Sequence, residues 1–199
     1  DYTTIIPFTR CLSGPFDFTP GIFNLHLTPE RPDNRANTTL AKQLAHYLVI
    51  YSPLQMVADL PENFKGQPAF QFIKDVPVDW EKTEVVHAEI GDYLTIIRKD
   101  RNSPDWYIGS VTDENKRELK MDLDFLEHRG NYIAQFYVDG EKADWESNPY
   151  DISIFECLVS KKTHIKLNLA KGGGAAIRIR EATKNDDLSQ IPKYSELMK

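Results

Sequence analysis

The stretch ELKMDLDFL, residues 118–126, alternates polar and apolar side chains. Leu119, Met121 and Leu123 fall on one face of an extended chain, and the lysine and aspartates between them fall on the other. This period-two alternation is typical of a strand with one buried and one solvated face. The stretch therefore predicts a strand of an antiparallel sheet.

The same alternation recurs through the second half of the chain. Turn signals lie between the runs, at Asp139-Gly140 and in the glycine run 172–174. About eight short strands at spacings near ten residues predict an antiparallel β-sandwich, to which we assign residues 79–181. The other predicted strands are EVVHAEI, DYLTIIRKD, DWYIGSVTD, NYIAQFYVDG, DISIFECLVS, HIKLNLA and AAIRIR.

Residues 1–78 have a different pattern. The apolar runs TTIIPF (3–8) and LQMVA (54–58) predict strands buried on both faces of a parallel sheet. TTLAKQLAHYLVIY predicts an amphipathic helix of about 14 residues, and PAFQFIKD (68–75) predicts a shorter one. Strand and helix alternate, which predicts βα units, and hence an α/β module followed by an all-β module. Residues 182–199 lose all periodicity, and we expect a flexible tail.

Composition excludes several function classes. The formal net charge is −6 and no lysine or arginine cluster stands out, so neither nucleic acid nor an anionic membrane surface is an expected partner. Cys11 and Cys157 match no metal or redox spacing, and we expect both to be free and buried. No apolar segment is long enough to span a bilayer. The chain also lacks GxSxG, HExxH and phosphate-loop motifs.

Candidate ligand-binding residues follow the two predicted parallel strands. Asp17 lies in the turn GPFDFTPG (14–21) after the first strand, and Asp59 ends the second. Loops at the carboxyl ends of parallel strands hold ligands, and Phe16 and Phe18 add aromatic faces on which sugars stack. The alternative is structural: Asp17 accepts backbone bonds within a turn, Asp59 caps the next helix, and the two rings fill the rim.

Trp80, Trp106 and Trp145 belong to the β module. Exposed on a sandwich, they would form a carbohydrate-binding platform, whereas burial in the core is the more common arrangement of tryptophan. Exposure of Trp106 or Trp145 distinguishes the two.

Several phrases, in unbroken order over residues 3–179, resemble the C-terminal part of glycoside hydrolase family 97. They are PFTR, GPFDFTPGIF, NTTLAKQLAHYLVIYSPLQMVADLPE, AFQFIKDVPVDWEKTEVVHAEIGDYLTIIRKDRN, WYIGSVTDEN and AKGGGAAIRI. The family comprises α-glucosidases and α-galactosidases with an N-terminal β-sandwich, a central (β/α)8 barrel and a C-terminal antiparallel domain. The resemblance implies that residues 1–78 are the last βα units of the barrel and that residues 79–181 are the C-terminal domain, which is associated with oligomerisation.

The resemblance also implies what lies outside this chain. The family's calcium-binding glutamates, its general acid and its base or nucleophile come from earlier segments, so we expect no catalytic or metal-binding residue here. Because glycoside hydrolysis requires two carboxyl groups across the scissile bond, we expect the chain to be inactive alone. Phe16, Asp17, Phe18 and Asp59 are then candidates for binding substrate at the rim.

The expected whole protein is a calcium-dependent, exo-acting α-glycosidase. The resemblance implies a periplasmic or secreted location, an oligosaccharide substrate, and two further partners, the preceding part of the protein and a second copy of the chain. The abrupt start at DYTTIIPF is consistent with a cut through a longer protein. The alternative function is a non-catalytic carbohydrate-binding or oligomerisation module. Inversion or retention, and the choice between glucoside and galactoside, stay open.

Overall fold

A computed structural model describes residues 2–28, 30–31, 33–127 and 130–198; the outermost residues of the predicted modules, 1 and 199, lie outside this set. The predicted antiparallel strands are confirmed, and the structure contains eight of them among the described residues. They are β1 (Trp80–Glu89), β2 (Tyr93–Asp100), β3 (Trp106–Thr112), β4 (Arg117–Asp122), β5 (Tyr132–Asp139), β6 (Ile152–Val159), β7 (His164–Leu169) and β8 (Gly174–Glu181).

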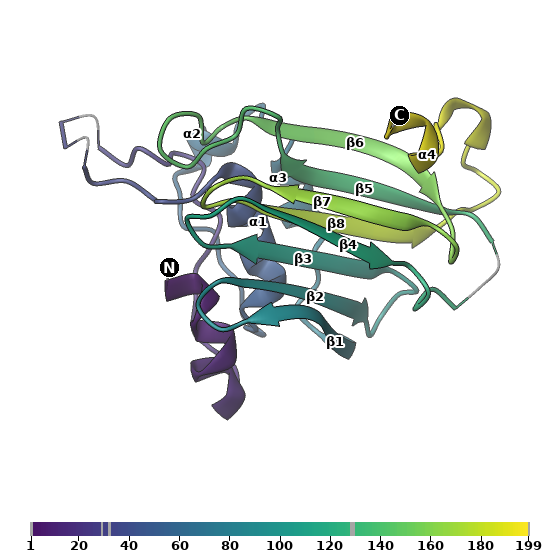
Figure 1. The fold of residues 1–199 in the computed structure, drawn as a ribbon, viewed down its shortest axis with the longest axis horizontal. Coiled ribbons are helices and arrows are strands. Elements are labelled where there is room, and N and C mark those ends of the chain that lie inside the picture. Colours follow the sequence, from purple (N-terminus) through teal and green to yellow (C-terminus); the bar gives the residue numbers. More distant parts are fainter. Residues whose placement is uncertain (1, 29, 32, 128–129, 199) are drawn as a thin grey trace.

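The strands form two layers. Six of them make one sheet in the order β1-β2-β3-β8-β5-β6, and β4 pairs with β7 in a separate two-stranded ribbon. All pairings between these strands are antiparallel. The β4–β7 ribbon lies over one face of the six-stranded sheet (Figure 1). The ELKMDLDFL stretch therefore supplies the outer layer of the predicted sandwich.

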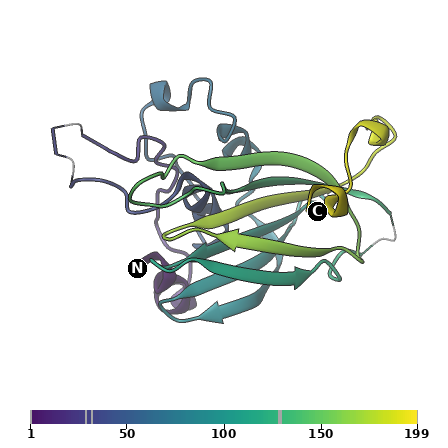
Figure 2. The same ribbon diagram turned by 45° about the horizontal axis from the view of Figure 1, so that its top comes forward.

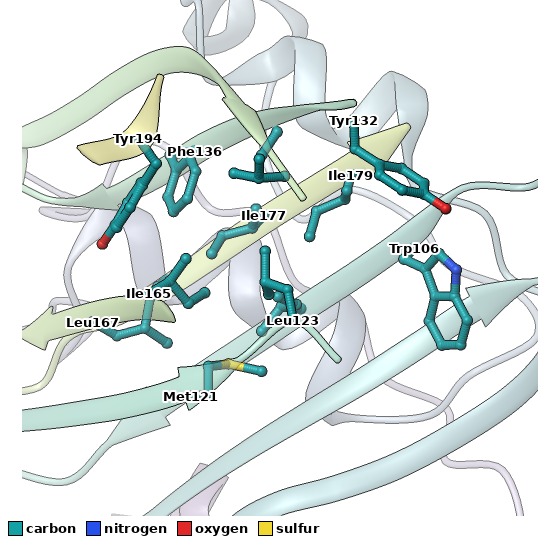
Figure 3. Packing of buried hydrophobic residues seen from close by; sticks show 14 of the residues in the cluster. Trp106, Met121, Leu123, Tyr132, Phe136, Ile165, Leu167, Ile177, Ile179 and Tyr194 are labelled. Carbon is teal, nitrogen blue, oxygen red and sulfur yellow. The ribbon is translucent and has the colours of Figure 1, made fainter. Parts of the chain in front are cut away.

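The main hydrophobic core fills the space between these layers. The apolar face of the ribbon contributes Met121 and Leu167, and the sheet contributes Trp106 and Ile177 (Figure 3). Leu123, just after β4, is fully buried among them. Alternation along each strand places these side chains on one face, which is the physical basis of the sequence pattern.

The helix α1 (Leu40–Val49) covers the other face of the six-stranded sheet (Figures 1 and 2). Two glycines allow its close approach. A Cβ on Gly109 would lie 2.5 Å from the Leu48 Cβ, and one on Gly174 would lie 2.8 Å from the Lys42 Cα. Larger residues at either strand position would separate the helix from the sheet.

Local sequence explains where α1 begins and why it is buried on every side. Thr39 is the N-cap, and its hydroxyl accepts a hydrogen bond from the Lys42 amide. The predicted helix is confirmed, although it is shorter, with ten residues. The sheet packs on one side of it, and Ile6, Phe23 and Leu25 of the N-terminal segment belong to the apolar clusters that enclose it.

Among the described residues, three further short α-helices lie outside the sheets: α2 (Pro61–Phe64), α3 (Phe70–Asp75) and α4 (Tyr194–Leu197). Helix α3 confirms the prediction for residues 68–75, and Phe72 is fully buried. None of the helices in the described part of the chain is long and apolar enough to cross a membrane.

The two predicted parallel strands are wrong. Residues 3–8 lie in 3₁₀ turns, Tyr2–Thr4 and Ile6–Phe8, and residues 54–58 have no regular structure. Leu54 is 71% exposed and Met56 is 50% exposed. A strand needs a neighbour to satisfy its backbone groups, and no described strand lies beside either run. The described residues therefore form no parallel sheet, and the end of a (β/α)8 barrel is not directly visible.

The expectation of a flexible tail is corrected for its last part. The Leu158 amide donates to the Pro192 carbonyl at 2.8 Å, and Lys193 forms a parallel bridge with Leu158 on the outer edge of β6. Tyr194 is buried against Phe136 in the core (Figure 3). The tail thereby covers the Leu158 end of β6, which blocks pairing with another chain at that point of the edge.

Candidate functional site: the rim loop and its supports

The segment 14–24, which we call the rim loop, contains all the predicted rim residues except Asp59. Backbone hydrogen bonds hold it at two points, from the Phe16 amide to the Tyr51 carbonyl and from the Ala58 amide to the Pro20 carbonyl. Gly21 has a φ of +85°, and a Cβ there would lie 2.4 Å from the Tyr47 hydroxyl oxygen. This turn therefore requires glycine for both conformation and space.

Gln43 on α1 anchors the middle of the rim loop. Its Oε1 accepts hydrogen bonds from the amides of Gly21 and Ile22 at 3.1 and 3.2 Å, and its Nε2 donates to Thr38. The side chain is buried, so its polar atoms need these partners. The helix thus fixes the course of the loop through one side chain, a role that the helical pattern alone did not indicate.

Asp59 anchors the end of the rim loop. Its carboxylate accepts hydrogen bonds from the amides of Phe23 and Asn24 at 2.7 and 2.6 Å. It also accepts from the Leu60 amide and from the Asn63 side chain. Partial burial acts to raise the pKa of Asp59, but these hydrogen bonds outweigh burial and hold that pKa below its usual value. The contacts give Asp59 a structural role, and the substrate-binding role stays a prediction.

Phe16 and Phe18 lie together in the rim loop. The two rings stack with centroids 5.9 Å apart, and Phe18 meets the His46 ring of α1 edge-on at 5.8 Å. Asp17 between them is exposed. In the described part of the chain no hydrogen bond links Asp17 to Asp59, whose contacts are with the far end of the rim loop. The rings pack against the apolar cluster around α1.

Replacing Asp59 with alanine should loosen the rim loop without unfolding the chain. Four donors lose their acceptor, and the expected loss in the free energy of unfolding is about 2 kcal/mol because the site is only partly buried. Hydrogen exchange at the Phe23 and Asn24 amides should become faster. Asp59→Asn, which keeps one acceptor oxygen, should retain part of the protection. Equal exchange in the wild type and Asp59→Ala would contradict the anchoring role.

A buried polar cluster at the start of α1 escaped the sequence reasoning. Asp139 accepts hydrogen bonds from the Thr39 hydroxyl at 2.6 Å and from the amides of Ala170 and Gly174 at 2.8 and 2.9 Å. The Lys42 ammonium donates to the Thr112 carbonyl at 2.8 Å. The glycine run turns beside the carboxylate, where a Cβ on Gly173 would lie 1.9 Å from Asp139 Oδ2. The sequence signals at this place were the Asp139-Gly140 turn and this glycine run, and neither indicated a buried cluster.

Burial shifts the pKa values of this cluster strongly. It raises the pKa of Asp139 to about 6, although the hydrogen bonds and the Lys42 charge act in the opposite direction. It lowers the pKa of Lys42 to about 7, although Asp113 and Asp139 oppose the change. Lys42 is fully buried and Asp139 is 8% exposed, and their hydrogen bonds join α1 to the sheet.

The remaining predicted features have clear positions. Trp80 and Trp106 are buried, whereas Trp145 is half-buried under the guanidinium of Arg35. Both cysteines are free, and Cys157 is buried as expected, whereas Cys11 is half-buried. The described residues contain no group of three or more His, Cys, Asp or Glu side chains placed to hold a metal ion.

Comparisons with known proteins identify what the chain is similar to. The sequence model of the family described as "Glycosyl-hydrolase 97 C-terminal, oligomerisation" matches residues 79–180. A "Retaining alpha-galactosidase" of Bacteroides thetaiotaomicron is 32% identical over 90% of this chain and 27% of its own length. A "Probable retaining alpha-galactosidase" of Streptomyces bingchenggensis is 30% identical over 70% of the chain and 20% of its own length.

Solved structures give the same result. A glycoside hydrolase family 97 enzyme from Pseudoalteromonas sp. strain K8, solved in complex with panose, matches with a TM-score of 0.87 and 46% identity. The match covers 91% of this chain and 28% of that one. A β-arabinopyranosidase matches with a TM-score of 0.73 and 25% identity over 89% of this chain and 27% of that one. The chain thus spans about a quarter of the length of these relatives.

Proposed function

Because the chain belongs to glycoside hydrolase family 97 and corresponds to its C-terminal part, we propose that it is a portion of a calcium-dependent, exo-acting α-glycosidase. The whole protein would hydrolyse terminal α-linked glucose or galactose. The single observation that carries this proposal is the 0.87 TM-score at 46% identity to a family 97 enzyme. The names of the two curated relatives support an α-galactoside substrate, and panose in the solved complex supports an α-glucoside.

Residues 2–78 would then belong to the catalytic barrel. The exposed apolar run at Leu54, Met56 and Val57 supports this assignment, because apolar side chains gathered on a surface favour a covering partner. The partner we propose is the preceding part of the same protein. In that assembly the rim loop would form one wall of the active site, with Phe16, Asp17 and Phe18 near the substrate.

We propose that the catalytic pair and the calcium ligands lie in that preceding part, and that the whole protein is periplasmic or secreted. Of the candidate acids here, Asp59 accepts hydrogen bonds from four donors, and Asp17 is exposed. Two carboxyl groups at a defined separation are required for the chemistry. The chain supplies support for the site rather than its reacting groups.

The test is hydrolysis of p-nitrophenyl α-glucoside and α-galactoside by the purified chain in the presence of calcium. We expect no turnover above the rate of buffer alone. A longer form of the protein that includes the preceding segments should hydrolyse at least one substrate, and calcium chelation should abolish its activity. Turnover by the 199-residue chain would overturn the proposed division of roles.

A second function is self-association through residues 79–181, which we call the β domain. The description of the matching family, which names oligomerisation, favours it. Sugar binding on a tryptophan platform is not favoured, because Trp106 is only 2% exposed and the Arg35 guanidinium lies over the half-buried Trp145 ring. Sedimentation equilibrium of the whole chain measures this association. A dimer or larger species would support the second function, and a monomer at high concentration would contradict it.

A further inference from the structure

A groove lies on the β domain between the ribbon strand β7 and the sheet strands β5 and β6. Its volume is about 640 Å³, within the range of small-molecule sites. Its lining includes Glu141 of the loop after β5, Tyr194 of helix α4, and Met198 directly after that helix. We call it the β6–β7 groove. It lies in the β domain, outside residues 2–78, which contain the rim loop.

Aromatic rings form the floor of the β6–β7 groove. Phe155 stacks on Phe136 with centroids 4.7 Å apart and an interplanar angle of 6°. Tyr194 stacks on Phe136 at 5.6 Å (Figure 3). Phe136 and Tyr194 are buried, whereas Phe155 is half-buried, which leaves part of its ring accessible in the groove. A fixed ring of this kind offers a flat apolar surface to a ligand.

The backbone of Asn168 on β7 offers hydrogen bonds to a ligand in the β6–β7 groove. The Lys166 amide and carbonyl both bond the Tyr194 hydroxyl, and the Ala170 amide bonds Asp139, so these groups point away from β4. Because alternate residues of an antiparallel strand direct their polar groups to the same side, the Asn168 amide and carbonyl point into the groove. No described residue bonds either group. Asn168 therefore presents one donor and one acceptor.

The residues on either side of Asn168 along β7 limit the size of a ligand. An added strand would need the backbone groups of Lys166 and Ala170, but Tyr194 and Asp139 already occupy them. A ligand about the size of one sugar ring fits between these two occupied backbone positions. The charges around the groove cancel, which disfavours a phosphate or another charged ligand. The cations are Lys116, Lys166 and Lys171, and the anions are Asp139, Glu141 and Asp144.

We propose that the β6–β7 groove binds a neutral pyranose unit, which stacks on Phe155 and hydrogen-bonds the backbone of Asn168. A pyranose has a C–H face that packs on an aromatic ring and hydroxyls that donate and accept at its edge. Ser153 and Glu141 at the groove provide further polar groups. The choice of an α-linked sugar rests on the proposed function. The groove would hold an oligosaccharide at a point outside the catalytic domain.

The experiment is a titration of the isotope-labelled chain with maltotriose and with methyl α-galactoside, followed by amide NMR. We expect the Asn168 and Ser153 amides to shift with at least one sugar, with a dissociation constant of ~1–10 mM for a ligand of this size. Inositol, a neutral polyol of similar size that lacks a glycosidic substituent, should produce a weaker shift. No shift at Asn168 with either sugar would overturn the proposal.

Variants of strand β6 test the stacking. Phe155→Leu keeps apolar bulk and removes the flat ring, and it should weaken binding about fivefold or more. Phe155→Tyr should retain binding. Ile154→Ala is the matched control, because successive strand residues face opposite sides of the sheet. Equal affinity in Phe155→Leu and wild type, or shifts confined to the rim loop, would overturn the proposal. Failure here leaves the glycosidase proposal intact, since hydrolysis by the longer protein tests that separately.

Discussion

Replacing His46 with leucine should remove much of the acid sensitivity of this chain. His46 is buried on α1, and neither ring nitrogen has a hydrogen-bond partner among the described residues. Burial, with a smaller contribution from the Lys42 charge, lowers the pKa of His46 to about 3. In the unfolded chain the imidazole takes up a proton near pH 6.5, whereas in the folded chain it resists protonation down to about pH 3.

The unfolded state therefore binds more protons between these two pH values, and stability falls as the pH decreases through this window. One pKa unit corresponds to about 1.4 kcal/mol, so the contribution of His46 to this loss is about 3 kcal/mol at pH 4 and roughly 5 kcal/mol near pH 3. The measurement is urea unfolding of the wild type and His46→Leu at pH 7 and pH 4.

The free energy of unfolding should differ between pH 7 and pH 4 by about 3 kcal/mol less in His46→Leu than in the wild type. A change in packing affects both pH values equally and therefore cancels in this comparison. The matched control is His26→Leu, because His26 is an exposed histidine outside α1. It should keep the wild-type dependence on pH. If the free energy of unfolding depends on pH in His46→Leu as it does in the wild type, another group causes the acid sensitivity.

Replacing Asp139 with alanine should destabilise the chain by about 3–5 kcal/mol, because it leaves buried partners unsatisfied and removes a charge near Lys42. The Thr39 hydroxyl and the amides of Ala170 and Gly174 would lose their acceptor. These groups join α1 to the glycine turn and to β8. We therefore expect lower stability together with faster hydrogen exchange at the Gly174 amide, measured by urea unfolding and amide NMR.

Asp139→Asn is the matched variant, since its amide keeps one acceptor oxygen and a similar shape. Burial raises the pKa of Asp139 to about 6. Between about pH 4 and pH 6 the carboxyl group therefore ionises in the unfolded state first, and the wild type loses stability as the pH rises. The asparagine variant lacks this titration. The wild-type advantage over Asp139→Asn should therefore shrink by about 2–3 kcal/mol between pH 4 and pH 7. A constant advantage would contradict the assigned pKa shift.

The β-sandwich was predictable because its information is local. ELKMDLDFL alternates, and in the structure Met121 is buried in the core while its neighbours Lys120 and Asp122 face solvent. The same is true of β7, in which Ile165 and Leu167 are buried and the residues between them are exposed. The alternation along these two strands of the ribbon is local and marks a buried and a solvated face. The central strand β3 is buried at every position, because α1 covers the second face of the sheet.

The predictions for residues 3–8 and 54–58 failed because they depended on partners. A continuous apolar run indicates burial on both faces, but burial requires chain elements on either side. With no described strand beside them, these runs form 3₁₀ turns or irregular segments, and Leu54 is exposed. Family resemblance identified the rim loop, but the roles of Gln43 and Asp59 in holding it come from contacts between distant positions.

By itself, the sequence determined the strand pattern, the position of α1 and the family. Each depends on residues that are close together along the chain, through a local hydrophobic period or a contiguous phrase. Tertiary structure alone decided that Asp59 is an anchor, that Lys42 and Asp139 are buried together, and that Asn168 faces an aromatic groove. These properties depend on which surfaces meet when the helix, the sheet and the ribbon pack. Burial and hydrogen bonding across such contacts set both the pKa values and the accessible polar groups, and no local pattern encodes them.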